Sequence, residues 1–361
     1  MKKLLTLALT SILVVSLTAC QSNDKGQVSE NTFKCDTLNV YNWGEYIGET
    51  VIQDFEDKFN VKVNYSLFDS NEILYTQLQG GNAYDILVPS EYMIERLRDE
   101  DLLQKLDLSL IPNISNLSKG LQGLAYDPNN EYSVPYFWGN VGIIYNTQTI
   151  DSKMVEELGY NIFLEESMKD RAYIYDSERD SFMMALKALG YSMNTTSDKE
   201  IQEAYNWLLK MDETINPYYV TDEVIDGMIT EQKDIAVAYS GQASVILDEN
   251  PNMEFFLPNE GTNYWTDGLV IPKSSECADL AHAFINEMLS YEVALQNSEY
   301  VGYPSNNQQV IDELSGEGGY YEGNSAYLPE TNVDNPKHEY FIHNDTLIKQ
   351  LSELWVNVKS K

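Results

Sequence analysis

The chain has 361 residues, of which 43% are hydrophobic and 12% aromatic, a globular composition with room for about two domains. This excludes a wholly disordered protein. Lysine and arginine total 23 against 57 aspartates and glutamates, so the formal net charge is −34. A surface this acidic repels phosphate backbones and anionic lipid head groups, which argues against nucleic acid as a partner. Cationic small molecules are favoured, although a plainly solvated acidic surface has the same composition.

The first twenty residues have the layout of a secretory signal. Lys2 and Lys3 precede an apolar run from Leu4 to Leu17, which is shorter than the roughly 20 residues of a membrane-spanning helix. The sequence LTAC at 17–20 resembles a bacterial lipobox, which implies cleavage before Cys20 and attachment of lipid to its sulfur. An ordinary signal peptide that ends near a cysteine is the alternative. No later stretch is long and apolar enough to span a membrane, so we expect an exported chain.

The segment 20–35 is polar and is predicted to tether the lipid to the folded body. Once Cys20 is lipidated, two cysteines remain, Cys35 and Cys277. They could pair in an oxidising exterior, but free thiols are an equal alternative from the sequence alone.

Strand-like and helix-like segments alternate from Leu38 onward, which favours an α/β fold. Hydrophobic periodicity predicts strands at 38–41, 61–65, 84–88, 173–175, 235–239 and 268–272. It predicts helices at 51–59, 70–80, 91–106, 182–189, after Ser197, at 280–295 and around 347–354. An apolar segment at 134–145 is expected to cross into a second lobe, and 312–336 is expected to be an acidic, glycine-rich loop.

Common catalytic and metal-binding motifs are missing from the sequence. It has three histidines and no H-E-x-x-H, C-x-x-C, G-x-S-x-G or G-x-G-x-x-G pattern. The stretch 127–131 has the oxygen spacing that begins a calcium loop, but the loop's central glycine and twelfth-position glutamate are missing. We therefore expect no metal and no cofactor. A carboxylate pair acting as in a glycosidase is an alternative, because the separation of such a pair depends on the fold.

Aromatic residues stand next to polar or acidic ones after several predicted strands, at the edge where open α/β sheets bind ligands. They occur at 42–46, 90–92, 176–180 and 239–241, and also at 265–267 and 301–304. An aromatic face attracts a cation by about 0.5–2 kcal/mol, and a carboxylate supplies the opposite charge. Such a site suits an alkylammonium ligand.

Five segments together resemble the bacterial spermidine/putrescine-binding proteins of ABC importers. They are VYNWGEY at 40–46, YDILVPS at 84–90, YSVPYFWG at 132–139, ALGYS at 188–192 and VGYP at 301–304. The resemblance implies an α/β, two-lobed periplasmic-binding-protein-like fold of type II, with a ligand cleft between lobes joined by crossing strands. It also implies capture of polyamines (spermidine or putrescine) and their delivery to an ABC permease and its ATPase, without catalysis.

The resemblance also assigns residues to the cleft. The aromatic walls would be Trp43, Tyr46, Tyr92, Tyr239, Trp265 and Tyr303. Asp267 would face an ammonium group, Ser90 would hydrogen-bond near one end of the ligand, and Asp180 would supply an acid at the start of a helix. Three further assignments are Asp176, which is the alternative to Asp180, Ser177 and Phe341. Ser177 and Asp180 also fit a helix capping box.

Four positions depart from the family pattern. Gly44 stands where a hydroxyl residue can help, Ser177 where a second acid can occur, Tyr239 where tryptophan is frequent, and Phe341 where a polar amide can reach the ligand. Asp267 and Asp180 are then two firm counter-charges for a ligand that carries two charges in putrescine and three in spermidine. We lean slightly to spermidine.

The predicted organisation is a signal peptide at 1–19, a lipidated tether at 20–35, a first lobe from 36–142 plus 266–311, and a second lobe from 143–265 plus 312–361. The protein would be a monomer, held at the extracytoplasmic face of the bacterial cell membrane by the lipid on Cys20. A secreted carbohydrate-active enzyme, or a sugar-binding receptor with a carboxylate and aromatic cleft, is the alternative.

Overall fold

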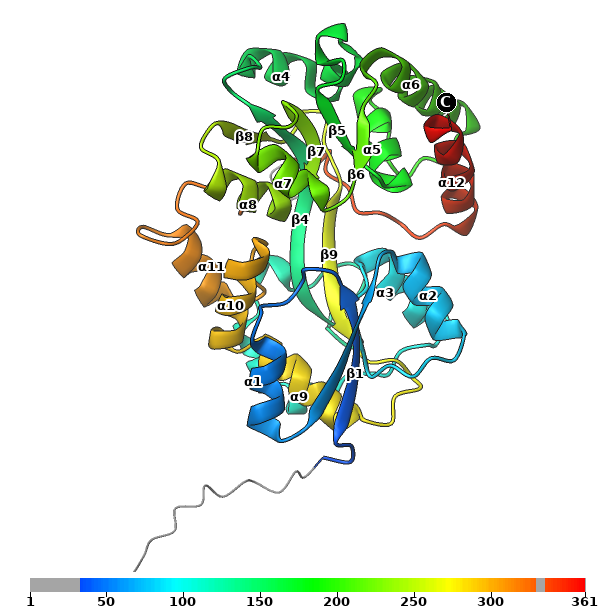
Figure 1. The fold of residues 1–361 in the computed structure, drawn as a ribbon. Coiled ribbons are helices and arrows are strands. Elements are labelled where there is room, and N and C mark those ends of the chain that lie inside the picture. The colour runs from blue at the N-terminus through cyan, green and yellow to red at the C-terminus, as the bar shows by residue number, and fades with distance from the viewer. Residues whose placement is uncertain (1–32, 329–334, 361) are drawn as a thin grey trace, which may run out of the picture.

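Two lobes joined by long strands make up the molecule in a computed structural model that describes residues 33–328 and 335–360 (Figure 1). The predicted signal peptide, the lipobox with Cys20 and most of the tether lie outside the described residues. Within the described residues, no helix has both the length and the apolar character needed to cross a membrane.

One nine-stranded sheet runs through both lobes in the order β2-β1-β3-β9-β4-β7-β5-β6, and β8 is added beside β4. The strands are β1 (Thr37–Trp43), β2 (Lys62–Phe68), β3 (Ile86–Leu87), β4 (Ser133–Asn146), β5 (Ala172–Tyr175), β6 (Tyr218–Val220), β7 (Ile235–Tyr239), β8 (Met253–Phe256) and β9 (Tyr264–Val270). The first part of β4 pairs with β9 and its second part pairs with β7 and β8. β4 therefore belongs to both lobes.

Helices flank the strands in both lobes (Figure 1). They are α1 (Val51–Phe59), α2 (Asn71–Gln79), α3 (Glu91–Asp99), α4 (Ser152–Leu158), α5 (Glu178–Ala188), α6 (Asp198–Ile215), α7 (Glu223–Ile229), α8 (Ser240–Glu249), α9 (Ala278–Met288), α10 (Tyr291–Val301), α11 (Gln308–Ser315) and α12 (Asp345–Lys359). The α/β fold class is confirmed. The sequence pattern did not predict α4, α7, α8, α11, β6 or β8.

Each lobe has a main hydrophobic core of its own. In one, Leu38 of β1 and Ile86 of β3 are buried with Phe284 of α9. In the other, Phe182 of α5 is buried with Trp355 of α12. The C-terminal helix α12 therefore packs on the second lobe. The residue limits of the two lobes stay a prediction.

Two predicted helices have different bounds in the structure. The helix expected over 91–106 ends at Asp99, because Asp101 takes a left-handed conformation with φ of 56° and the N–H of Leu102 returns to the carbonyl of Leu97. The helix expected over 280–295 is divided into α9 and α10, with Ser290 at the N-cap of α10.

The strand expected at 268–272 also has different bounds. It begins at Tyr264 and ends at Val270, so Trp265 and Asp267 lie inside β9 and not before it. Successive side chains of a strand point to opposite faces, so these two residues share one face of β9.

A disulfide joins Cys35, just before β1, to Cys277, just before α9. Of the two alternatives that the sequence left open, the structure therefore has the cysteines paired. Beside them, the backbone N–H of Lys34 donates to Asp279 Oδ2 at 2.8 Å. The bond joins residues that are 242 positions apart, so it closes a very long loop in the unfolded chain.

Breaking this disulfide is expected to lower the free energy of unfolding by about 2–5 kcal/mol, because the unfolded chain gains freedom. Urea unfolding followed by circular dichroism measures the change. Reduced wild-type protein and a double variant with Cys35→Ser and Cys277→Ser should share one lowered midpoint, and the variant should not respond to reductant. An unchanged midpoint on reduction would contradict the prediction.

Candidate functional site

One face of β9 carries a cluster of aromatic rings. The Trp265 ring meets the rings of Tyr303 and Tyr239 edge to face, with centroids 5.0 Å and 5.9 Å away. Opposite Trp265 on β4 stands Gly139, where a Cβ atom would lie 3.0 Å from the indole. Because Gly139 has no side chain, the indole of Trp265 can occupy this space. On the same side, Tyr46 packs against Tyr303 at 5.8 Å.

Asp267 is buried next to this cluster, with 4% of its surface exposed. Its Oδ2 accepts a hydrogen bond of 2.8 Å from the hydroxyl of Tyr46. Among the described residues, its Oδ1 has no hydrogen bond of good geometry, although the Ser90 hydroxyl is close enough to oppose the effect of burial on the pKa. Burial is the larger effect and raises the pKa of Asp267 to about 7. A cation beside this carboxyl group would favour its ionised form.

Asp180 is the second buried carboxylate of the cluster and comes from the other lobe, in the first turn of α5. Its Oδ2 accepts from the Tyr239 hydroxyl at 2.7 Å and its Oδ1 accepts from Asn263 Nδ2 at 3.3 Å. Burial raises the pKa of Asp180, and these hydrogen bonds oppose the rise. Of the predicted capping box, the structure has the N-cap half, because the Ser177 side chain accepts from the backbone N–H of Asp180. Helix capping and placement beside Tyr239 are therefore compatible.

A continuous row of rings connects the two carboxylates. It runs from Tyr46, which donates to Asp267, through Tyr303 and Trp265 to Tyr239, which donates to Asp180. Tyr46 follows β1 of the first lobe, and Tyr239 ends β7 of the second. The result is an aromatic wall with a carboxylate at each end, at the crossing of β4 and β9, in which Tyr239 is partly buried and the other three rings are buried.

A second group of assigned residues gathers around Arg179, which the sequence analysis missed. The guanidinium carbon of Arg179 lies 3.6 Å from the centre of the Tyr92 ring and 5.2 Å from that of Phe341. Its Nη2 is 3.2 Å from Glu72 Oε1 on α2. Arg179 belongs to α5, whereas Tyr92 and Glu72 belong to helices of the other lobe, so this group links the two lobes.

Two assigned residues lie apart from the aromatic wall. Trp43 donates from Nε1 to the carbonyl of Val88 at 2.9 Å and packs on Phe68. Asp176 is exposed, accepts from Trp355 Nε1 at 3.1 Å and pairs with Lys359 of α12. The structure thus brings Asp180 and not Asp176 to Tyr239.

The carboxylate of Asp127 is used by a turn. It accepts hydrogen bonds from the backbone N–H groups of Glu131, Tyr132 and Ser133, at 3.0, 2.9 and 2.8 Å. These bonds account for the calcium-like spacing that the sequence shows there. Over residues 33–328 and 335–360, no three side chains of the ligating types come together as a metal site.

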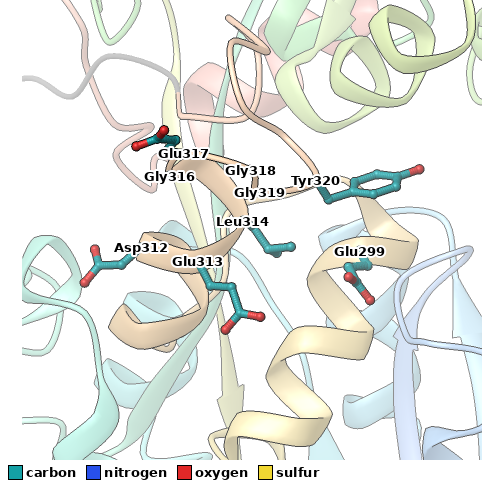
Figure 2. A pocket seen from close by; sticks show the side chains of 9 residues that line it. All are labelled: Glu299, Asp312, Glu313, Leu314, Gly316, Glu317, Gly318, Gly319 and Tyr320. Carbon is teal, nitrogen blue, oxygen red and sulfur yellow. The ribbon is translucent and has the colours of Figure 1, made fainter.

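The outer surface has an acidic groove at α11 and the loop that follows it (Figure 2). Four carboxylates line it, from Glu299, Asp312, Glu313 and Glu317. In Figure 2 the carboxylates of Asp312, Glu313 and Glu317 point away from one another and not to a common centre. This arrangement is that of a solvated acidic surface, in contrast to the enclosed wall at β9.

Comparison with known proteins places this geometry in a family. Residues 50–360 match the family described as bacterial extracellular solute-binding protein. The chain belongs to this family. The spermidine/putrescine-binding periplasmic protein of Escherichia coli strain K12 is 36% identical over 293 residues, which cover 78% of this chain and 81% of that protein.

Solved structures of similar proteins agree. A spermidine/putrescine ABC transporter substrate-binding protein of Streptococcus pneumoniae has a TM-score of 0.74 and 37% identity, covering 90% of this chain and 98% of its own. A lipoprotein of Treponema pallidum has a TM-score of 0.76 and 27% identity, covering 90% and 100%. The resemblance inferred from the sequence and the two-lobed fold are confirmed. The family's role is to bind substrates for transport.

Unliganded protein is expected to lose stability as pH rises from about 4 to 7. Asp267 keeps its proton in the folded protein up to about pH 7, while the unfolded chain loses it near the ordinary value of 3.8. The folded state then binds more protons, so stability falls with rising pH. Asp267→Asn should make this dependence shallower and stabilise the protein at pH 8 by about 1–3 kcal/mol. Urea titrations at pH 5 and pH 8 measure it.

Asp57→Asn, an exposed site on α1, is the control and should behave like wild type. The same pH dependence in Asp267→Asn and in wild type would refute this account of Asp267.

The close approach of α8 to Tyr303 predicts the effect of a single methyl group. A Cβ atom on Gly241 would lie 2.5 Å from the Tyr303 ring. Gly241→Ala is therefore expected to displace this ring and to destabilise the protein by about 1–3 kcal/mol, although alanine is the better helix former. Gly120→Ala, where the added atom meets open space, is the control. Thermal unfolding compares the two variants, and equal melting temperatures would count against the contact.

Proposed function

We propose that this chain is the extracytoplasmic substrate-binding protein of an ABC importer for polyamines. It captures spermidine or putrescine and delivers the ligand to the permease and ATPase complex. The observation that carries the proposal is the aromatic wall that ends in Asp267 on one side and in Asp180 on the other. The Escherichia coli relative, at 36% identity, is named for the same two polyamines.

The chemistry of the wall fits a flexible polycation. Methylene groups of the ligand lie against the faces of Trp265, Tyr303 and Tyr239, and its ammonium groups approach the two carboxylates. Each ring contributes about 0.5–2 kcal/mol to a cation. A dissociation constant near 1 μM corresponds to about −8 kcal/mol, which a few such contacts and two ion pairs supply after the costs of association.

Closure of the lobes couples binding to delivery. Tyr46 and Asp267 come with the first lobe, and Tyr239 and Asp180 with the second, so a ligand that contacts both sets favours the closed arrangement by its differential affinity. β4 and β9 cross between the lobes and serve as the hinge. The contact of Arg179 with Tyr92 and Glu72 spans the same gap. The permease then recognises the closed form.

The protein acts as a lipid-anchored monomer at the outer face of the cell membrane, and it catalyses no reaction. Two observations support the anchor: the lipobox-like sequence that ends at Cys20, and the similar lipoprotein of Treponema pallidum. The resemblance further assigns Trp43, Ser90, Tyr92, Phe341 and Ser177 to the ligand, in addition to the residues of the aromatic wall.

Titration calorimetry of the chain without residues 1–20 tests this function. Spermidine or putrescine should bind with micromolar affinity that weakens with salt. Asp267→Asn should weaken binding by at least about 30-fold, because it removes one charge of a buried pair, and Trp265→Ala should also weaken it. Asp176→Asn is the control, since that residue pairs with α12, and it should keep wild-type affinity.

Absence of heat and of any thermal shift with polyamines would overturn the proposal. Salt-independent binding of a sugar would favour the sugar receptor, and hydrolysis of a glycoside would favour the enzyme.

A further inference from the structure

A third buried carboxylate lies next to Asp267 of the aromatic wall. Glu91 is the first residue of α3, directly after Ser90, and 3% of its surface is exposed. Its Oε2 accepts from the backbone N–H of Thr266 at 3.1 Å. Its Oε1 has no hydrogen-bond partner in the part of the chain that the structure describes. Burial of a charged oxygen without a donor is costly, so this atom marks a place where a positive charge would be stabilising.

The carboxyl group of Glu91 lies at a gap in the pairing along the edge of β9 that faces away from β4. On one side of the gap, Ser90 pairs with Asp267, and on the other, Glu339 pairs with Asn263. Between these two bridges the N–H of Thr266 meets the Glu91 side chain and not a neighbouring strand. Glu91 is therefore fixed to the backbone of the strand that carries Asp267, one residue away from it.

Charged and titratable groups face Glu91 from several elements. The charge of Asp267 on β9 raises the pKa of Glu91, and that of Arg179 on α5 lowers it. The hydroxyl groups of Tyr92, Tyr126 and Tyr340 are also within electrostatic range. Burial is the largest effect and raises the pKa of Glu91 to about 8. At neutral pH the empty protein therefore keeps a proton on Glu91 for most of the time.

The surroundings of Glu91 are polar and incompletely paired. The hydroxyl of Tyr126, a side chain that is 7% exposed, has no hydrogen-bond partner among the described residues. The Nε atom of Arg179 is also buried without a partner in the described chain. Both of these groups are within electrostatic range of Glu91, so the polar surroundings of its carboxyl group are incompletely paired.

We propose that Glu91 is the third counter-charge of the cleft and that it sets the preference for a trication over a dication. The inference rests on the proposed function. Asp267 and Asp180 match the two charges of putrescine, whereas spermidine brings a third. When spermidine binds, the O–H bond of the Glu91 carboxyl group breaks, the proton passes to the buffer, and the carboxylate that remains balances the third ammonium group. Putrescine leaves this proton in place.

Calorimetry at pH 7 in phosphate and in Tris, which differ in ionisation enthalpy, counts the protons released on binding. With wild-type protein, spermidine should release close to one proton more than putrescine. Glu91→Gln should remove this difference in proton release. It should weaken the binding of spermidine by about 10-fold, while the affinity for putrescine changes by less than about 3-fold. Glu95 is a half-exposed residue of the same helix beside Arg98, so Glu95→Gln is the matched control. It should leave the affinity and the proton release unchanged for both ligands.

Equal proton release for the two ligands in wild-type protein would overturn the inference, and so would an equal loss of both affinities in Glu91→Gln. The proton count in wild-type protein needs no variant, so a poorly folded Glu91→Gln does not prevent a decision. Glu91→Thr is a second substitution that removes the carboxyl group and can replace Glu91→Gln in the affinity measurements. If wild-type protein binds neither polyamine, the proposed function itself fails, which is a different result from binding without a difference in protons.

Discussion

The antiparallel pairing of β4 with β9 is the constraint on which the rest of the structure depends. It carries the chain across from one lobe to the other, and it fixes which side chains of β9 share a face. Trp265 and Asp267 are presented together because they are two positions apart in that strand, and Gly139 of β4 leaves the space that the indole needs. Rings from both lobes can then meet on this one face.

The carboxyl groups at the aromatic wall do not favour a stable empty form. Carboxyl groups at Asp267, Asp180 and Glu91 are buried, and burial raises the pKa of each of them. Removing a charged carboxylate from water costs several kcal/mol unless a cation compensates. The empty closed arrangement is therefore costly at neutral pH, and opening of the lobes or protonation relieves it. A bound polycation also offsets the cost of burying these carboxylates. The free energy that this burial costs in the empty protein therefore contributes to the driving force for closure when a polycation binds.

The sequence was sufficient for the fold class, because alternating strand and helix periods follow from burial patterns that survive in the primary structure. It was sufficient for much of the aromatic wall as well, through the resemblance. It could not distinguish paired from free Cys35 and Cys277, since pairing depends on the distance between β1 and α9. Glu91 was missed because an acid in the first turn of a helix is ordinarily an exposed residue that favours the helix dipole. Only the tertiary contact with Thr266 shows that this one is buried.

The acidity of the protein acts at two different ranges. The formal charge of −34 creates a long-range attraction for polycations, and the carboxylates of the groove in Figure 2 contribute to it. Salt at physiological concentration screens such exposed charges beyond about 8 Å. This long-range attraction brings cations to the surface without distinguishing among them. The buried carboxylates act at contact distance, where solvent screens them little. In the proposed mechanism their number and protonation decide which cation is held, so selectivity depends on three residues out of 57 acidic ones and on where the fold hides them from water.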